Sequence, residues 1–260
     1  MQSCLPSDPP ACISPSTATA PAMPTPIDAL GADLADAFGG KSLLFYTGAV
    51  AGSAAMAFSG ADSSIRVAVQ QHLGSSIYGN AATLTGYVLP VALAPGVWLT
   101  GLLVGDRAAT GAGSAAVQAL AVTAVTAAVL KITLGRAYPP EDAHTFRPFQ
   151  SWSWPFPAWP SGHTSSAFSV VAALSAYYGA DELWIPLVGY PVAAAIGLGM
   201  LSGDEHWASD LLAGVVLGQS VGWSIGRAFR ARARSETAPS VSLVPILGPS
   251  SRGLAIAGVW

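Results

Sequence analysis

The segment Ser114–Leu134, with the sequence SAAVQALAVTAVTAAVLKITL, decides the fold class. It contains a single charged side chain, Lys131, and is otherwise built from apolar, small and uncharged polar residues. A run of this length matches the roughly 20 residues that a helix needs to cross about 30 Å of hydrocarbon. We therefore predict that this segment forms a membrane-spanning helix.

Further apolar segments, several of them slightly shorter, lie on both sides of this one. They are Ser42–Phe58, Leu84–Val104, Thr164–Ala180, Leu183–Leu201 and Leu211–Ile225. Glycines four residues apart, such as Gly214 and Gly218, permit close contact between membrane helices. These segments together predict an all-α, six-helix membrane bundle over residues 41–235. A soluble all-α domain of the same layout is the alternative, because the segments are rich in alanine rather than leucine.

The composition of the whole chain also favours a membrane protein. Of the 260 residues, 52% are hydrophobic and only 10% are charged, whereas soluble domains contain about 25% charged residues. The net charge of −3 excludes the basic face that nucleic-acid-binding proteins need. The only cysteines, Cys4 and Cys12, are too few for a disulfide framework or a four-cysteine zinc site.

The N-terminal part, residues 1–40, differs from the bundle. Residues 1–26 are rich in Pro, Ser, Thr and Ala, and this composition predicts disorder. The stretch that follows predicts a helix lying on the membrane surface. The residues that share its apolar face are Ile27, Leu30, Leu34 and Phe38.

The C-terminal tail, residues 236–260, changes character again. Val241–Leu247 and Leu254–Trp260 flank a turn rich in Gly, Pro and Ser. This pattern predicts a short β-hairpin.

The orientation of the bundle follows from its basic residues. Six spans place both ends of the chain on one side, and the connection between the third and fourth spans on the other. The second side carries Arg66, Arg136 and Arg147. The side of the termini carries Lys41, Arg107, Arg227, Arg230, Arg232 and Arg234. Because basic loops stay inside, we expect the termini in the cytoplasm of a bacterial cell, and the opposite end outside its cytoplasmic membrane.

Three polar clusters stand out, because polar residues are otherwise scarce in the spans. Lys131–Pro139 reads KITLGRAYP and ends the third span, Pro160–Thr164 reads PSGHT and begins the fourth, and His206–Asp210 reads HWASD before the sixth. The alternating direction of the spans puts all three clusters at the outer end. Ionisable residues that share one end of a bundle are candidates for function.

The histidine and the carboxylate of the third cluster are spaced for interaction. His206 and Asp210 are four residues apart, which on a helix brings their Cβ atoms to about 5–6 Å. A carboxylate there holds an imidazole in one tautomer and supports its positive charge when it acts as a nucleophile. Taken alone, the pair is also compatible with a helix start that has no catalytic role.

The first two clusters offer groups that suit an anion. Gly162 lets a ligand approach the backbone, and the amides at a helix start favour a phosphate. Ser161 can equally be an ordinary helix N-cap. Lys131 and Arg136 supply positive charge, although interfacial cations of this kind also occur without a ligand.

In this order, on membrane spans, the clusters resemble the type 2 phosphatidic acid phosphatase (PAP2) superfamily, which includes membrane lipid phosphatases, soluble acid phosphatases and vanadium haloperoxidases. The resemblance covers about residues 84–226 and implies the PAP2 bundle fold. The family's Pro-Ser-Gly-His motif is complete at Pro160–His163, and its His-x-x-x-Asp motif is complete at His206–Asp210. The family-like sequence Leu-Leu-Ala-Gly follows at Leu211–Gly214.

The chain departs from the family pattern at two positions that usually hold phosphate-binding arginines. Tyr138 replaces the arginine of the first motif, Lys-x₆-Arg-Pro, and Met200 replaces the arginine six residues before His206. Arg136, which is also common in the first motif, is retained. Loss of one preorganised charge typically lowers a rate by about 10²–10³-fold, so we expect a weakened activity.

The resemblance implies a metal-independent membrane phosphatase that hydrolyses lipid phosphate monoesters or diphosphates and needs no cofactor. His206 would attack phosphorus to form a phosphohistidine, Asp210 would orient it, and His163 would protonate the leaving group and then activate water. The residues that would hold the phosphoryl oxygens are Lys131, Arg136, Ser161 and Gly162. The expected partners are a lipid phosphate and the membrane, and not a nucleic acid.

Two alternatives remain for the function. A degenerate family member would bind a phosphate headgroup or a partner protein without turnover, which the missing arginines favour and the complete set of His163, His206 and Asp210 opposes. A lipid phosphotransferase would pass the phosphoryl group to a second lipid.

Overall fold

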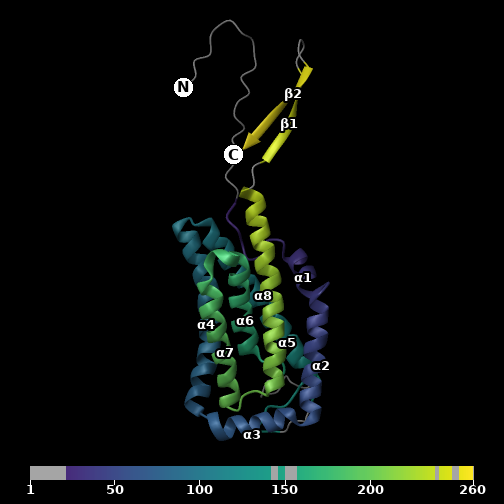
Figure 1. The fold of residues 1–260 in the computed structure, drawn as a ribbon, viewed down its shortest axis with the longest axis vertical. Helices are drawn as coiled ribbons and strands as arrows, with labels where there is room; N and C mark the ends of the chain where they lie inside the picture. Colours follow the sequence, from purple (N-terminus) through teal and green to yellow (C-terminus); the bar gives the residue numbers. More distant parts are fainter. Residues whose placement is uncertain (1–21, 142–145, 150–156, 238–239, 248–251, 260) are drawn as a thin grey trace.

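The computed structural model describes residues 22–141, 146–149, 157–237, 240–247 and 252–259. Within these ranges the chain is mostly helical (Figure 1). The helices are α1 (Leu30–Phe38), α2 (Ser42–Ser59), α3 (Ala61–Leu73), α4 (Ser76–Val104), α5 (Arg107–Leu134), α6 (Gly162–Tyr178), the 3-10 helix η1 (Gly179–Glu182), α7 (Trp184–Ser202) and α8 (Ala208–Thr237). The strands are β1 (Ser240–Leu247) and β2 (Arg252–Val259).

The apolar segments of the sequence coincide with α2, α4, α5, α6, α7 and α8, which confirms the helical fold class. Among the described helices, α2, α4, α5 and α7 are long and apolar enough to cross a membrane. The expected count of six spans is therefore not reached by this measure. The 17 residues of α6 are few for a span, and the second half of α8 is rich in arginine.

The inner helices α6 and α8 touch through their backbones. Every fourth residue along α8 is a glycine, from Gly214 through Gly218 and Gly222 to Gly226. A side chain at any of these positions would collide with a backbone carbonyl of α6 or of its N-cap residue; at Gly218 the carbonyl is that of Ser165. The small-residue spacing seen in the sequence thus fixes the start of α8 against the start of α6.

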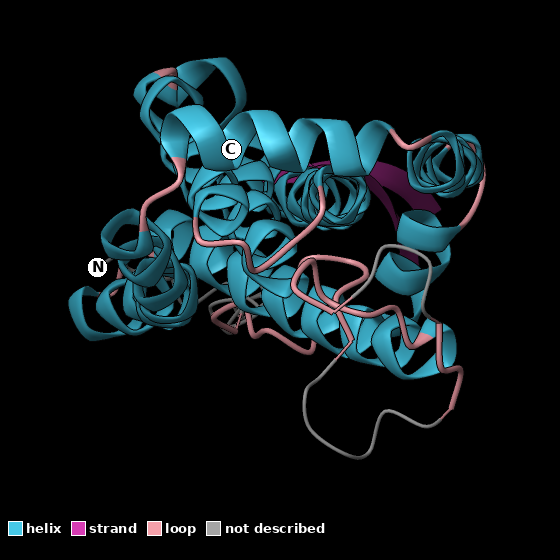
Figure 2. Cartoon of the chain, turned by 90° about the horizontal axis from the view of Figure 1, so that it is seen from below, coloured by secondary structure: helices cyan, strands magenta, loops and turns pink. Residues whose placement is uncertain are grey.

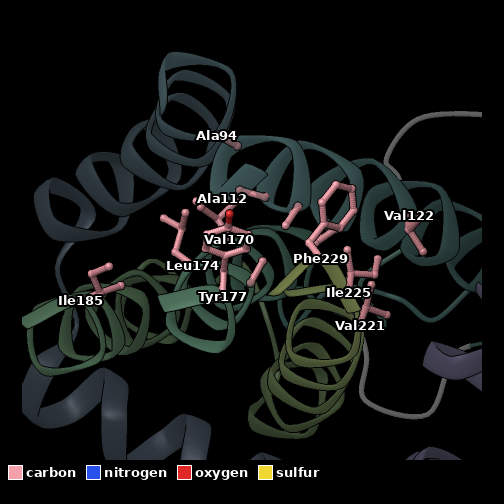
Figure 3. Close-up of a cluster of buried hydrophobic side chains, with 14 of the residues drawn as sticks. Ala94, Ala112, Val122, Val170, Leu174, Tyr177, Ile185, Val221, Ile225 and Phe229 are labelled. Atoms are coloured by element: carbon pink, nitrogen blue, oxygen red, sulfur yellow. The ribbon is translucent and has the colours of Figure 1, made fainter. Parts of the chain in front are cut away.

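The main hydrophobic core lies where α5, α6 and α8 meet (Figure 3). The helix α5 contributes mostly alanines, such as Ala112, which allow the larger side chains of its neighbours to interlock. The larger members of the core are Val170, Leu174 and Tyr177 of α6, and Val221, Ile225 and Phe229 of α8. One polar cluster lies at the start of α6 and another lies just before α8. The core therefore fixes the positions of these two clusters relative to each other.

The helix α3, which carries Arg66, was not predicted from the sequence. In the structure, α3 lies across one end of the bundle (Figures 1 and 2). Gly60 adopts a left-handed conformation with φ 81°, which lets the chain turn sharply from α2 into α3. Polar residues dominate α3, so it lacks the long apolar run by which the other helices were found.

The N-terminal segment is ordered from Ala22 onward, in contrast to the disorder expected up to residue 26; residues 1–21 lie outside the described part. Ser114 of α5 donates to the carbonyl of Pro24 over 3.0 Å, and Gln118 donates to that of Asp28 over 3.3 Å. Buried polar side chains require partners, and these carbonyls supply them.

The helix α1 begins at Leu30 and packs against α8. Leu34 and Phe38 join the main core, whereas the side chain of Ile27 is exposed. Asp33 is buried and forms a bidentate ion pair with Arg232 of α8, with distances of 2.7 and 2.8 Å. An ion pair thus anchors the predicted surface helix.

The C-terminal strands β1 and β2 pair antiparallel, with a register that runs from Ser240↔Val259 to Leu247↔Arg252. In Figure 1 they extend from the far end of α8, away from α3. They lie outside the helical bundle and contribute nothing to the polar clusters.

Candidate active site

The structure brings the three polar clusters together at the end of the bundle that α3 covers (Figure 2). The first follows the end of α5, the second starts α6, and the third precedes α8. The rings of His163 and His206 lie next to each other, with centroids 6.4 Å apart and planes inclined by 66°. Residues separated by 43 positions in the chain therefore form one site.

His206 and Asp210 lie side by side and are buried, as their spacing predicts. The Nδ1 atom of His206 is 3.4 Å from Oδ2 of Asp210, and the same oxygen accepts a hydrogen bond of 2.9 Å from the amide of Trp207. Burial lowers the pKa of His206 below its ordinary value, while the hydrogen bond with Asp210 opposes this shift. Burial therefore favours the neutral form of this imidazole.

Arg136 lies on the other side of Asp210. Its Nη1 atom donates to Oδ1 of Asp210 over 2.7 Å, and its Nη2 atom donates to Oδ2 of Asp62 over 2.7 Å. All three side chains are at most 2% exposed. We had expected Arg136 to present its charge to a phosphate. In the structure it pairs instead with the carboxylates of Asp62 and Asp210.

Asp62 is a member of the site that the sequence analysis missed. It lies at the start of α3, where its carboxylate accepts hydrogen bonds from the amide and the hydroxyl of Ser209, at 3.0 and 2.5 Å. These bonds tie α3 to the first turn of α8 and close a buried ring of Asp62, Ser209, Arg136 and Asp210. The only signal in the sequence was an acidic residue two positions after Gly60.

His163 occupies the first turn of α6 and points toward His206. The edge of its ring contacts Tyr87 of α4, with ring centroids 4.1 Å apart. A side chain at Gly86 would lie 3.0 Å from the Cβ and Cδ2 atoms of His163, so this glycine makes room for the ring. Within the described part of the chain, neither ring nitrogen of His163 has a hydrogen-bond partner. His163 is therefore a candidate for exchanging a proton with a ligand.

Ser161 acts as the N-cap of α6, the second of the two roles considered for it. Its hydroxyl accepts from the amide of Thr164 over 3.4 Å, and its own amide donates to the carbonyl of Asp210 over 3.0 Å. Gly162 follows in the first turn, and the nearest atom to a side chain placed there would be Cε of Lys131, at 3.8 Å. Of this pair, Gly162 is the one that leaves room for a ligand.

Lys131 lies in the last turn of α5 and reaches back to the segment before α6. Its ammonium group donates to the carbonyls of Pro157 at 2.6 Å and Ala158 at 3.2 Å. Both partners are uncharged, so the charge of Lys131 is not neutralised by them.

The two departures from the family pattern lie in different surroundings. The ring of Tyr138 is 5.8 Å from that of His206, whereas Met200 is fully buried in α7. Burial raises the pKa of Tyr138 well above its ordinary value, and neighbouring Tyr87, Glu205, Asp210 and Glu141 raise it further. Tyr138 therefore presents a neutral hydroxyl beside the histidines.

A bundle with several apolar helices and two neighbouring histidines at one end defines a multi-pass membrane protein with a paired-histidine site. Residues 112–234 match the family model of the PAP2 superfamily. This match, which covers just under half of the chain, agrees with the resemblance that the motifs predicted.

The fold and part of the sequence also resemble individual members of this group. A crystal structure of a transmembrane PAP2-type phosphatidylglycerolphosphate phosphatase from Bacillus subtilis superposes with a TM-score of 0.54 and 15% identity, covering 76% of this chain and 98% of that one. A lipid A 1-phosphatase from Porphyromonas gingivalis is 38% identical over 65 residues, which are 25% of this chain. The match spans only 15% of that relative's length.

Proposed function

We propose that the protein is a membrane phosphatase that hydrolyses lipid phosphate monoesters or diphosphates through a phosphohistidine intermediate. The observation that supports this most directly is the buried His206–Asp210 pair, which lies beside the ring of His163 and its unpartnered nitrogens, with 6.4 Å between ring centroids. The two relatives are both named as phosphatases of lipid phosphates, in line with this proposal.

In the first step, the neutral imidazole of His206 attacks phosphorus and the bond from phosphorus to the leaving oxygen breaks. Asp210 stabilises the positive charge that develops on the imidazole. Arg136 and the amide of Trp207 hold the carboxylate in place from its other sides. His163 gives a proton to the leaving oxygen.

In the second step, His163 takes a proton from water, and the water oxygen attacks the phosphohistidine. The phosphate leaves and His206 returns to its neutral form. In both steps the phosphoryl oxygens lie near the ammonium group of Lys131 and the backbone of Gly162. Arg136 and Ser161, which we had expected to bind phosphate, are instead positioning residues in this mechanism.

Binding without turnover is a second candidate, favoured by Met200 and Tyr138 at positions that usually hold arginines. Transfer to a lipid alcohol shares the first step and differs only in the acceptor that replaces water. The test below separates both candidates from hydrolysis.

The proposed location is the bacterial cytoplasmic membrane, with the site on the non-cytoplasmic side. The distribution of the basic residues supports this proposal. Arg232 and Arg230 pair with Asp33 and Asp181 at the end opposite α3, whereas Arg66 and Arg136 lie at the site. An acyl chain can stay in the bilayer while its phosphate reaches the end of the bundle.

The test is release of inorganic phosphate from a panel of lipid phosphates by the full chain in detergent. We expect release by the wild type that persists with a chelator and is inhibited by vanadate, together with a phosphoenzyme that is labile to acid. His206→Ala should abolish both, and His72→Ala, which changes an exposed histidine on α3, should not. Headgroup binding without release would favour the second candidate, and release only with an added alcohol would favour transfer.

A further inference from the structure

An apolar groove separates α2 from α5 on the outside of the bundle. The helix α2, which forms one edge of the bundle in Figure 1, packs against α8 rather than against α5. The part of the groove near the site has a volume of about 350 Å³, and the part farther from the site has a volume of about 200 Å³. Both parts are lined by Val50 and Trp159, so they adjoin and form one groove.

The walls of this groove are almost entirely apolar. Leu130 and Leu134 line it from α5, one turn apart, and Leu217 lines it from α8. On α2 the side chains of Val50 and Phe58 are 54% and 70% exposed. Because α2 is long and apolar enough to cross a membrane, such side chains face hydrocarbon. The groove is therefore open to the acyl chains of the bilayer.

The length of the groove matches the depth of one leaflet. On α2 it extends from Tyr46 to Phe58. A rise of about 1.5 Å per residue makes this distance about 18 Å. Half of the hydrocarbon core, which is about 30 Å thick, is about 15 Å. One acyl chain therefore fits along the groove.

Two buried hydrogen-bond donors line the groove near the site. The side chains of Trp159 and Arg136 are only 8% and 2% exposed. In the described part of the chain, the Nε1 atom of Trp159 and the Nε atom of Arg136 have no hydrogen-bond partner. Buried donors are normally paired. Two unpaired donors in the lining of one apolar groove indicate that a ligand supplies the acceptors.

The charges around Arg136 indicate a neutral acceptor. Its Nη1 and Nη2 atoms already bind the carboxylates of Asp210 and Asp62, so two negative charges surround one positive charge, and an additional anion is disfavoured. An ester carbonyl accepts a hydrogen bond and carries no charge. Arg136 also follows the end of α5 at Leu134, which is the depth at which hydrocarbon gives way to the polar part of the bilayer.

We infer that the groove between α2 and α5 binds an acyl chain of a diacyl membrane lipid, whose ester carbonyls accept hydrogen bonds from Trp159 and Arg136. This lipid is not the substrate. Arg136 binds Oδ1 of Asp210, whereas His206 lies beside Oδ2, so the bound carbonyls lie behind the carboxylate and not at the nucleophile. The lipid completes the contacts of the guanidinium group that orients Asp210.

Two lipids that are not phosphatase substrates test the inference. Dimyristoyl phosphatidylcholine carries ester carbonyls, and its di-O-tetradecyl analogue has the same headgroup and chain length without them. Each is added to the delipidated full chain in detergent, and thermal unfolding is followed, because a ligand of the folded state raises Tm. We expect the ester lipid to reach half of its maximal Tm shift at a concentration about 5-fold lower than the ether lipid, as one or two net hydrogen bonds predict.

Equal concentrations for the two lipids, or no shift with either, would overturn the inference. The measurement needs no turnover, so its outcome is independent of the proposed phosphatase function.

Removal of one donor should reduce the difference between the lipids. Trp159→Phe keeps an aromatic ring and deletes the N–H group, so the 5-fold difference should fall to about 2-fold or less. The matched control is Trp184→Phe, which changes an exposed tryptophan at the start of α7 and should keep the full difference. A folded Trp159→Phe protein with the wild-type difference would contradict the inference.

Filling the groove should prevent binding of both lipids. Ala54 lines the groove, and Ala54→Phe should abolish the Tm shift with either lipid. The neighbouring Ala55 is also exposed but does not line the groove, and Ala55→Phe should keep both shifts. Undiminished shifts in folded Ala54→Phe would contradict the inference. If Trp159→Phe and Ala54→Phe do not fold, the comparison of the two lipids with the wild type decides by itself.

Discussion

Arg136 and Asp210 form a buried ion pair of 2.7 Å in which the guanidinium holds one carboxylate oxygen and leaves the other for His206. The pair orients the carboxylate before any ligand arrives. Because both side chains are at most 2% exposed, their charges are poorly screened by solvent. The properties of His206 therefore depend on this pair.

Replacing Asp210 with Asn should lower kcat by about 10⁴-fold, the size found when a buried carboxylate behind a catalytic histidine is neutralised. The pH profile should change as well. Burial lowers the pKa of His206 and Asp210 opposes this, so the pKa falls further in the variant. Because the neutral imidazole is the active form, the acid limb of kcat/KM should lie below about pH 6.5 in the wild type and move lower in Asp210→Asn.

The control for this pH profile is Asp204→Asn, which changes a partly exposed carboxylate paired with Arg66. Its acid limb should match that of the wild type. An acid limb that moves to higher pH in Asp210→Asn would show that the carboxylate does not support the charged histidine.

The two histidines should respond differently to the leaving group. His163→Ala should lose less activity on a nitrophenyl ester than on a lipid ester, because a good leaving group needs little protonation. His206→Ala should eliminate the phosphoenzyme with both. Rapid-quench measurement of bound phosphate and of released alcohol separates the two effects, and equal losses for His163→Ala on both substrates would exclude it as the general acid.

Removal of Asp62 should destabilise the protein, because it leaves part of the charge of Arg136 buried without a partner. Breaking a buried ion pair costs about 3–5 kcal/mol, so we expect Asp62→Ala to reduce the free energy of unfolding in detergent by about this amount. Arg66→Gln removes the partly exposed pair with Asp204 and should change it by at most about 1 kcal/mol. Similar losses in the two variants would argue against a structural role for the buried ring.

The contact between α6 and α8 should be intolerant of a single methyl group. Gly218→Ala places a Cβ atom against the carbonyl of Ser165 and should destabilise the protein by about 1–3 kcal/mol, with loss of activity as the histidines shift. In Gly48→Ala, the added Cβ has no atom within 4 Å, so this variant should be neutral or stabilised. Thermal unfolding and kcat of the two variants provide the comparison.

The orientation is testable by cysteine labelling in intact cells after Cys4 and Cys12 are replaced by serine. Glu141→Cys lies at the exposed site end and should react with an impermeant thiol reagent. Lys41→Cys, at the opposite end, should react only after lysis. The reverse pattern would place the site in the cytoplasm.

Much of the fold was predictable because apolar length is a local property of the sequence. Each apolar run, such as Ser114–Leu134, lies within a helix or extends beyond one end of it by at most two residues. The alternating direction of the helices brings Lys131, His163 and His206 to one end. The tight spacing of Gly214 and Gly218 also indicated the close contact of α8 that the structure shows.

The roles of Arg136 and Ser161 could not be predicted, because they depend on partners distant in the sequence. Asp62 is 74 residues from Arg136 and 147 from Ser209, and no local pattern relates them. The helix α3 that carries Asp62 was missed because polar residues interrupt its apolar ones. A cation in a family motif indicated an anion partner, but only the packing showed that the anion is a carboxylate of the protein.

The backbone contact between α6 and α8 affects how the protein adapts to bilayers of different thickness. Bilayers vary in thickness, and helices adapt to the mismatch by tilting. Because α6 and α8 are in contact from Gly214 to Gly226, this pair should tilt as a single unit, and the helices α2, α4 and α7 should make the remaining adjustment. The separation of His163 and His206 should then be the same in thin and thick membranes. The rate of the chemical step should therefore not depend on bilayer thickness.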